Sequence, residues 1–203
     1  MANTQAQFGF KHIGYLSGGA PDFQQSTYTI QKTMATAIGF GDPVVAAATT
    51  GGPYIFQATA ALATASPILG IFVGCTFQNS NNQQVWSPFW PGVTAGADAT
   101  AYVIDAPNAK FLVASFLTAI TSANFGQVAN FTNGVITTTG QGNSIATLDQ
   151  ATVTSAGGTS ASSLPFKIIG TYPGVGNGSD QTTNFNWVVV TFNNQNFKSL
   201  VGV

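Results

Sequence analysis

The side chains that could perform acid, base or nucleophilic chemistry are few in this chain. His12 is the only histidine, Cys75 is the only cysteine, and glutamate and arginine are absent. A catalytic triad needs a histidine that an acid orients toward a nucleophile, and nothing near His12 supplies that pattern. We therefore expect His12 to be a surface or interface residue. Cys75 lies in the apolar pattern IFVGCTF, which predicts a buried small hydrophobe.

The acidic residues are all aspartates and are well separated along the chain. Asp98 and Asp105 flank one predicted strand, but glycosidase chemistry needs a positioned pair of carboxyl groups. We favour turn residues that hydrogen-bond their own backbone. The chain has no DxDxDG calcium loop, and GVGNGSD at 174–180 lacks the lysine of a phosphate-binding loop. The sequence thus predicts no enzyme, no metal site and no other cofactor.

Charge is unusually scarce. Only 5% of the 203 residues are charged, and the net charge is −1, whereas ordinary soluble domains carry about 25% charged residues. A nucleic-acid partner would need clustered cations, so we exclude one. Weak charge repulsion instead suits a chain that sits in a packed assembly. The segment MANTQAQFGF lacks the basic and apolar regions of a signal peptide, so we expect synthesis in the cytoplasm and no membrane insertion.

Hydrophobic residues alternate with a period of two over several short segments. The segment FNWVVVTF at 185–192 is apolar on both faces, which predicts an inner strand. Further strands are predicted at 27–30, 43–48, 53–59, 100–105, 109–117 and 164–172. Helix signals are short, as in AALATASP at 60–67. We therefore predict an all-β fold, an antiparallel β-sandwich or β-barrel of jelly-roll-like type.

Two segments depart from this pattern. Residues 1–26 are polar, with aromatic anchors such as Phe8, Phe10 and Tyr15 separated by glycines, which predicts an extended N-terminal arm. Residues 137–163 are rich in Thr, Ser and Gly, which predicts a long exposed loop or a small insertion. On this division, a single all-β domain spans residues 27–203.

The segment WSPFWPG at 86–92 follows the amide-rich run NSNNQQ. Its three aromatic residues have three open interpretations. They could close one end of the β core, or form a protein interface, where aromatic residues are enriched and charges depleted. They could also form a sugar platform, in which Trp faces stack on a ring while Asn side chains bond its hydroxyls.

Six segments in order resemble the head decoration (cement) proteins of tailed bacteriophages. They are NTQAQFGFKHIGYLSG, GFGDPVV, ILGIFVGCTF, VWSPFWPGVTAGADATAYVIDAPNAKFLV, LPFKIIGTYP and NWVVVTFNNQ. In that family an FGF or FGL arm leads to a GDPV strand entry. An LGVFxG strand, a YSPYWP-type turn and an AYVxDDPxxxF hairpin follow. This chain departs from the family pattern at Ala106, where a second Asp is common, and at Thr191, where Arg is usual.

The resemblance implies a non-enzymatic structural protein on the outer surface of a bacteriophage capsid. Its expected partners are the major capsid protein and copies of itself, as a dimer or trimer at capsid symmetry axes. We expect it to stabilise the capsid by binding major capsid protein subunits. The candidate contact residues are Phe8, Phe10, Tyr15, Trp86, Phe89 and Trp90. The alternative function is a carbohydrate- or receptor-binding β module of a virion.

Overall fold

The computed structural model describes residues 2–4, 7–22, 24–46, 54–92, 96–116, 119–132, 144–154 and 161–198. Their strands are β1 (Lys11–Tyr15), β2 (Ser26–Ile30), β3 (Pro43–Ala46), β4 (Ile55–Gln57), β5 (Gly70–Gln78), β6 (Gln84–Ser87), β7 (Ala99–Ile104), β8 (Ala109–Phe116), β9 (Val128–Thr132), β10 (Thr147–Thr154), β11 (Phe166–Thr171) and β12 (Trp187–Phe192). The helical segments are α1 (Ala60–Ala65) and the 3-10 turns η1 (Ser122–Asn124) and η2 (Ala161–Ser163).

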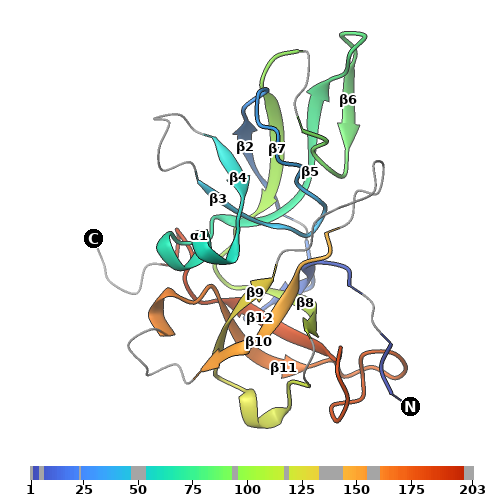
Figure 1. The fold of residues 1–203 in the computed structure, drawn as a ribbon, viewed down its shortest axis with the longest axis vertical. Coiled ribbons are helices and arrows are strands. Elements are labelled where there is room, and N and C mark those ends of the chain that lie inside the picture. Colours follow the sequence, from blue (N-terminus) through green and yellow to red (C-terminus); the bar gives the residue numbers. More distant parts are fainter. Residues whose placement is uncertain are drawn as a thin grey trace.

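One sheet closes into a barrel, in the lower part of Figure 1. Its order is β1-β8-β10-β9-β11-β12, and an additional pairing of β8 with β12 joins the ends. Strand β8 pairs with two different strands along the same edge. Its first residues pair with β1, and its last residues pair with β10. The β8–β10 pair is parallel, whereas the other pairs of this sheet are antiparallel. Closure leaves β1 as a short strand attached outside the five-stranded ring.

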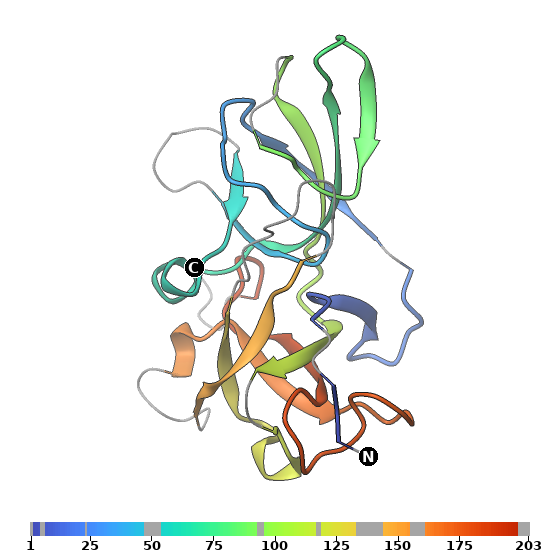
Figure 2. The same ribbon diagram turned by 45° about the vertical axis from the view of Figure 1, so that its right-hand side comes forward.

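The second sheet lies above the barrel in Figure 1, with the order β2-β7-β5-β3-β4 and with β6 paired to β5. An isolated bridge between Thr29 and Tyr54 brings its two outer strands, β2 and β4, toward each other. Figure 2 shows the chain after β1 running along the outside of the molecule from the barrel to this sheet. The predicted all-β fold is therefore confirmed.

The period-two segments form the strands that they predict. The segment at 185–192 contributes β12, which lies between β8 and β11 in the barrel wall. Val188 and Val190 are fully buried on one face, while Val189 on the other face is half-buried. Coverage on both faces explains why this strand carries apolar residues at successive positions instead of alternate ones.

The loop predicted at 137–163 is wrong for residues 147–154, which form β10. This strand pairs with both β8 and β9, so it is an inner strand of the barrel. Leu148 and Thr147 are fully buried, and the hydroxyls of Thr147 and Thr132 lie 2.6 Å apart. Thr is polar but β-branched, so it favours a strand while looking like loop composition. Residues 137–143 and 155–160 lie outside the described residues.

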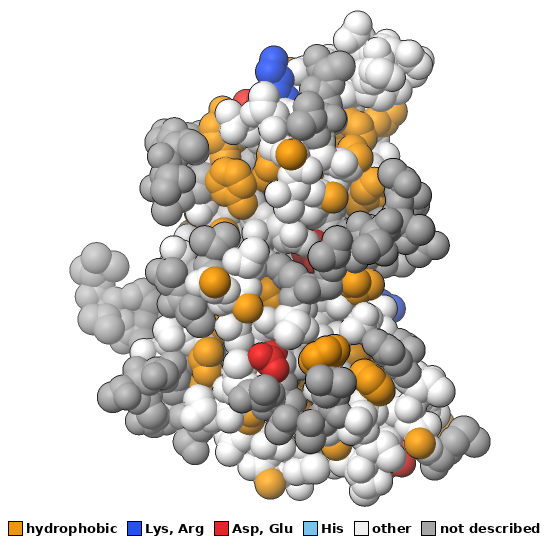
Figure 3. All heavy atoms as spheres, in the orientation of Figure 1, with side chains coloured by type: hydrophobic (Ala, Val, Ile, Leu, Met, Phe, Trp, Pro, Cys, Tyr) orange, Lys and Arg blue, Asp and Glu red, His pale blue; other side chains and the backbone are white. Residues whose placement is uncertain are grey.

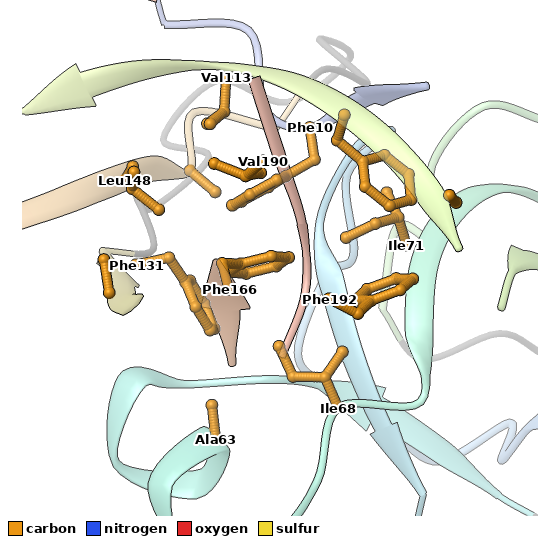
Figure 4. Close-up of a cluster of buried hydrophobic side chains, with 14 of the residues drawn as sticks. Phe10, Ala63, Ile68, Ile71, Val113, Phe131, Leu148, Phe166, Val190 and Phe192 are labelled. Carbon is orange, nitrogen blue, oxygen red and sulfur yellow. The ribbon is translucent and has the colours of Figure 1, made fainter. Parts of the chain in front are cut away.

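The buried core is continuous from the barrel into the second sheet. Figure 4 shows barrel side chains such as Phe166 and Phe192 in one cluster with Ile71 of β5 and with Ile68, which precedes β5. Phe10 lies among them, with its ring stacked on Phe166 at a centroid distance of 4.3 Å. A second cluster, which includes Ile30, fills the interior of the second sheet. The first cluster takes side chains from both sheets and thus holds them together.

The N-terminal arm is built into the fold over part of its length. Residues 11–15 form β1 on the edge of β8, and Phe10 is 1% exposed inside the core. The division into an arm of 1–26 and a separate domain therefore does not describe residues 10–15. The sequence does not reveal this short edge strand. Only one of its faces packs on the barrel, so glycines and polar residues interrupt the apolar pattern.

A buried carboxylate lies where three distant segments meet. Asp42 is 1% exposed and accepts hydrogen bonds from the Gly39 amide and from Gln57 Nε2, both at 2.7 Å. The Ser144 hydroxyl is a third partner. Burial raises the pKa of Asp42, because desolvation of the charged form outweighs these hydrogen bonds.

We predict that Phe10→Ala lowers the free energy of unfolding by about 3–5 kcal/mol, because it leaves a cavity in the shared core. Urea denaturation followed by circular dichroism measures this. Phe125→Ala is the matched control, since Phe125 is 44% exposed, and it should cost about 1 kcal/mol or less. Equal costs for the two variants would contradict the placement of Phe10.

The raised pKa of Asp42 predicts a pH-dependent stability. The folded protein holds this proton more tightly than the unfolded chain does. The stabilisation is therefore complete below the ordinary pKa of 3.8 and is lost as pH rises through the folded value. Asn cannot ionise, so the wild type should lose stability relative to Asp42→Asn as pH rises above 3.8.

Asp180→Asn is the matched control for this titration. Hydrogen bonds from Thr182 lower the pKa of Asp180. Its stabilisation is therefore present above the ordinary pKa and lost as pH falls, so its difference curve should have the opposite sign. Urea unfolding at a series of pH values measures both curves. If the stability of the wild type and that of Asp42→Asn vary with pH in parallel, burial does not raise the pKa of Asp42.

Candidate functional site

The amide-rich run before the tryptophans forms the turn of the β5–β6 hairpin. The Asn79 side-chain oxygen accepts hydrogen bonds from the backbone amides of Asn81, at 2.9 Å, and Gln83, at 3.0 Å. Asn82 takes a positive φ of 59°, which Asn tolerates better than most residues. These amides therefore fold the hairpin tip, and the tip lies at the far end of the second sheet in Figure 1.

Trp90 belongs to the core of the second sheet. It is 0% exposed, its indole Nε1 donates to the Met34 carbonyl at 3.1 Å, and its ring meets that of Phe77 edge-on at 5.7 Å. Its backbone exchanges hydrogen bonds with Ile38. A buried indole needs such a partner for its N–H. Trp90 therefore closes the core, as one of the three sequence interpretations proposed.

Trp86 lies on the outside of the same hairpin. It is paired with Thr76 across the β5–β6 ladder and is 63% exposed. One edge of its indole lies against Gly74, where an added Cβ would come within 3.1 Å of the ring. Gly74 also has a φ of +148° at a bulge in β5, so glycine suits both the backbone and the contact.

The three aromatic residues of WSPFWPG do not form one platform. Phe89 is half-buried, and its carbonyl accepts the Cys75 thiol at 3.4 Å. Its amide donates to the Ser87 hydroxyl at 3.2 Å, within a turn that Pro88 and Pro91 keep out of the ladder. Trp86 therefore points outward while Trp90 points inward. Trp90 is therefore unavailable to a sugar, and the sugar-binding interpretation stays a prediction that rests on the exposed Trp86.

A hollow of about 360 Å³ opens beside Trp86, between the barrel and the second sheet. We call it the Trp86 hollow. Its lining includes Lys11 and His12 of β1, Gln25, Val73 of β5 and Trp86 itself. The His12 ring packs on Tyr15 at 4.9 Å and on Phe111 at 5.7 Å. Burial lowers the pKa of His12, partly offset by the Gly14 backbone and Asp22.

The arm residues predicted as contacts are largely used within the chain. Tyr15 is 9% exposed, and its hydroxyl donates to the Asp22 carboxylate. Phe8 is half-buried and meets Trp187 edge-on at 5.0 Å. Phe10 and Trp90 lie in the core. Of the six predicted contact residues, Trp86 is the one whose side chain is mostly exposed.

The two aspartates that flank a predicted strand lie at opposite ends of β7. Asp98 accepts the Tyr54 hydroxyl at 3.1 Å and the Lys32 amide at 3.0 Å. Asp105 accepts the Tyr28 hydroxyl at 2.6 Å. Each binds groups of another segment, so neither acts as the self-contained turn residue that we expected. Cys75 is buried as predicted, and burial raises its pKa to about 12.

The structure exposes apolar residues that the sequence did not single out. Phe197 is 57% exposed and Val175 is 96% exposed. Phe197 follows the last strand, in the polar segment NNQNF. An isolated aromatic residue in a polar segment is the sequence feature that could have indicated its exposure. On the face shown in Figure 3, hydrophobic patches are separated by uncharged polar atoms and few charges appear.

The part of the chain that the structure describes contains no group of three or more His, Cys, Asp or Glu residues arranged to hold a metal ion. Over the same residues, no helix has the length and apolar character needed to cross a membrane. No protein-family model, curated protein or solved structure matches this chain. Its function has to be inferred from its own surface chemistry.

We predict opposite outcomes for the two tryptophans of the WSPFWPG segment. Trp90→Ala should lower the free energy of unfolding by about 3–5 kcal/mol, because it empties a filled core site. Trp86→Ala should change it by about 0.5 kcal/mol. Urea denaturation measures both values, and acrylamide should quench the fluorescence of Trp86 but not that of Trp90. A larger loss of stability from Trp86→Ala than from Trp90→Ala would reverse our assignment.

Proposed function

We propose that this chain is a structural bacteriophage protein that decorates the outside of a capsid and stabilises it by binding major capsid protein subunits. The observation that carries the proposal is Trp86, a large aromatic side chain held 63% exposed on a paired hairpin. Exposed aromatic residues dominate the binding energy of many protein interfaces. The order of the six sequence segments supports the choice of partner.

The scarcity of charge supports an interface of apolar and neutral polar contacts. Five lysines and six aspartates are spread over the whole chain, and several aspartates are already engaged by hydroxyl groups of the chain itself. A bound surface of this kind resists outward pressure by burying area between subunits. Copies of this chain would meet at the capsid symmetry axes, as a dimer or trimer.

Co-sedimentation with capsids assembled from the partner major capsid protein tests the proposal. Trp86→Ala should weaken binding by about 2 kcal/mol, or roughly thirtyfold, because it removes the exposed aromatic anchor. Phe125→Ala is the matched control, since Phe125 is also an exposed aromatic residue but lies beside η1 on the barrel. Absence of binding by the wild-type chain to such capsids would remove the proposal.

Binding should also persist in molar sodium chloride and fail in urea. Salt screens exposed charges that lie more than about 10 Å apart at 0.1 M and more than about 3 Å apart at 1 M, whereas urea weakens apolar contacts directly. The fraction of protein that pellets with capsids in each solution measures this. Release by sodium chloride alone would show that a few lysine or aspartate contacts dominate the interface.

A further inference from the structure

A second hollow adjoins the Trp86 hollow. It measures about 330 Å³, and we call it the Phe197 hollow. Its lining includes Gln24, Gln25, Ser26, Asp105, Pro107 and Phe197. Gln25 lines both hollows, and the successive residues Ile104 and Asp105 line one each. The two hollows meet at Gln25, and we call them together the groove, with Trp86 lining the first hollow and Phe197 the second.

The polar centre of this groove is held in a fixed position. Asp105 Oδ1 accepts the Ser26 hydroxyl at 3.0 Å, and Oδ2 accepts the Tyr28 hydroxyl at 2.6 Å. The Asp105 backbone carbonyl is held in turn by Gln195 Nε2 at 3.0 Å. A carboxylate offers about four acceptor positions, so two bonds leave it able to accept more hydrogens. The neighbouring amides of Gln24 and Gln25 supply both donors and acceptors.

The aromatic ends of the groove are open to a ligand. Trp86 and Phe197 are 63% and 57% exposed, so most of each ring is available for contact. A sugar ring presents C–H groups on its faces and hydroxyls around its rim. The faces can pack on aromatic rings, while the hydroxyls bond to a carboxylate and amides. Each hollow also falls within the size range of small-ligand sites, about 300–1,000 Å³.

We propose that this groove binds a neutral oligosaccharide, with one sugar against Trp86, another against Phe197, and hydroxyls bonded to Asp105 and Gln25. The charged groups Lys11 and Asp105 balance each other, which suits an uncharged ligand better than a polyanion. This site differs from a platform built on the whole WSPFWPG segment, since it uses Trp86 without Phe89 or Trp90. It does not depend on capsid binding.

A glycan array and a fluorescence titration test the proposal with the full chain. The array carries neutral oligosaccharides of glucose, galactose, mannose and N-acetylglucosamine, beside charged glycans. A neutral oligosaccharide should bind and shift the emission of Trp86. Trp86→Ala and Phe197→Ala should each weaken its binding by roughly tenfold or more, as measured by calorimetry, because each removes one stacking surface.

Controls separate the groove from general surface binding and from misfolding. Phe125→Ala removes an exposed aromatic residue outside the groove and should leave the affinity unchanged. Gln25→Ala removes only a partly solvated amide at the centre and should weaken binding while the urea unfolding curve stays constant. The proposal is overturned if no neutral glycan binds at millimolar concentration. It also fails if Phe197→Ala leaves the affinity unchanged, or if the groove binds peptides from a display library instead.

Discussion

The fold depends on the joint where Phe10 enters the core between the barrel and the second sheet. The Phe10 amide donates to the Gly41 carbonyl at 2.9 Å, and the Gly41 amide donates to the Phe72 carbonyl at 2.8 Å. Gly41 has a φ of +90°, and an added Cβ would lie 3.0 Å from the Phe10 nitrogen. Glycine is therefore needed here for both the turn and the close approach. The same joint includes the buried carboxylate of Asp42.

This joint also creates the surface to which we assign function. The Trp86 hollow lies between β1, which the joint attaches to the barrel, and β5 and β7 of the second sheet. The Phe197 hollow includes Gln24 and Gln25, which lead into β2, and Phe197, which follows β12. Residues from both sheets thus line one groove, and its shape follows from how the sheets are held together.

Because the surface carries few charges, the exposed aromatic residues contribute more to the recognition of partners. With 5% charged residues, the chain has little electrostatic means of attracting or excluding partners. Recognition must then come from shape, hydrogen bonds and apolar burial. Both proposals use Trp86, so a bound sugar and the capsid compete for that side chain, whereas Phe197 contacts the sugar alone.

The fold class and most of the inner strands follow from local patterns in the sequence. Strands β7, β8, β11 and β12 were predictable because their side chains alternate or are apolar on both faces, which is a local property. Strand β10 was not, because its Thr and Asp residues resemble loop composition, and Thr147 becomes buried only through the neighbouring strands. In contrast, the burial of Trp90 and the exposure of Trp86, four residues earlier, depend on how the hairpin packs in the folded chain. The physical reason is that burial depends on which face of the hairpin meets the rest of the chain, and no local pattern records that face.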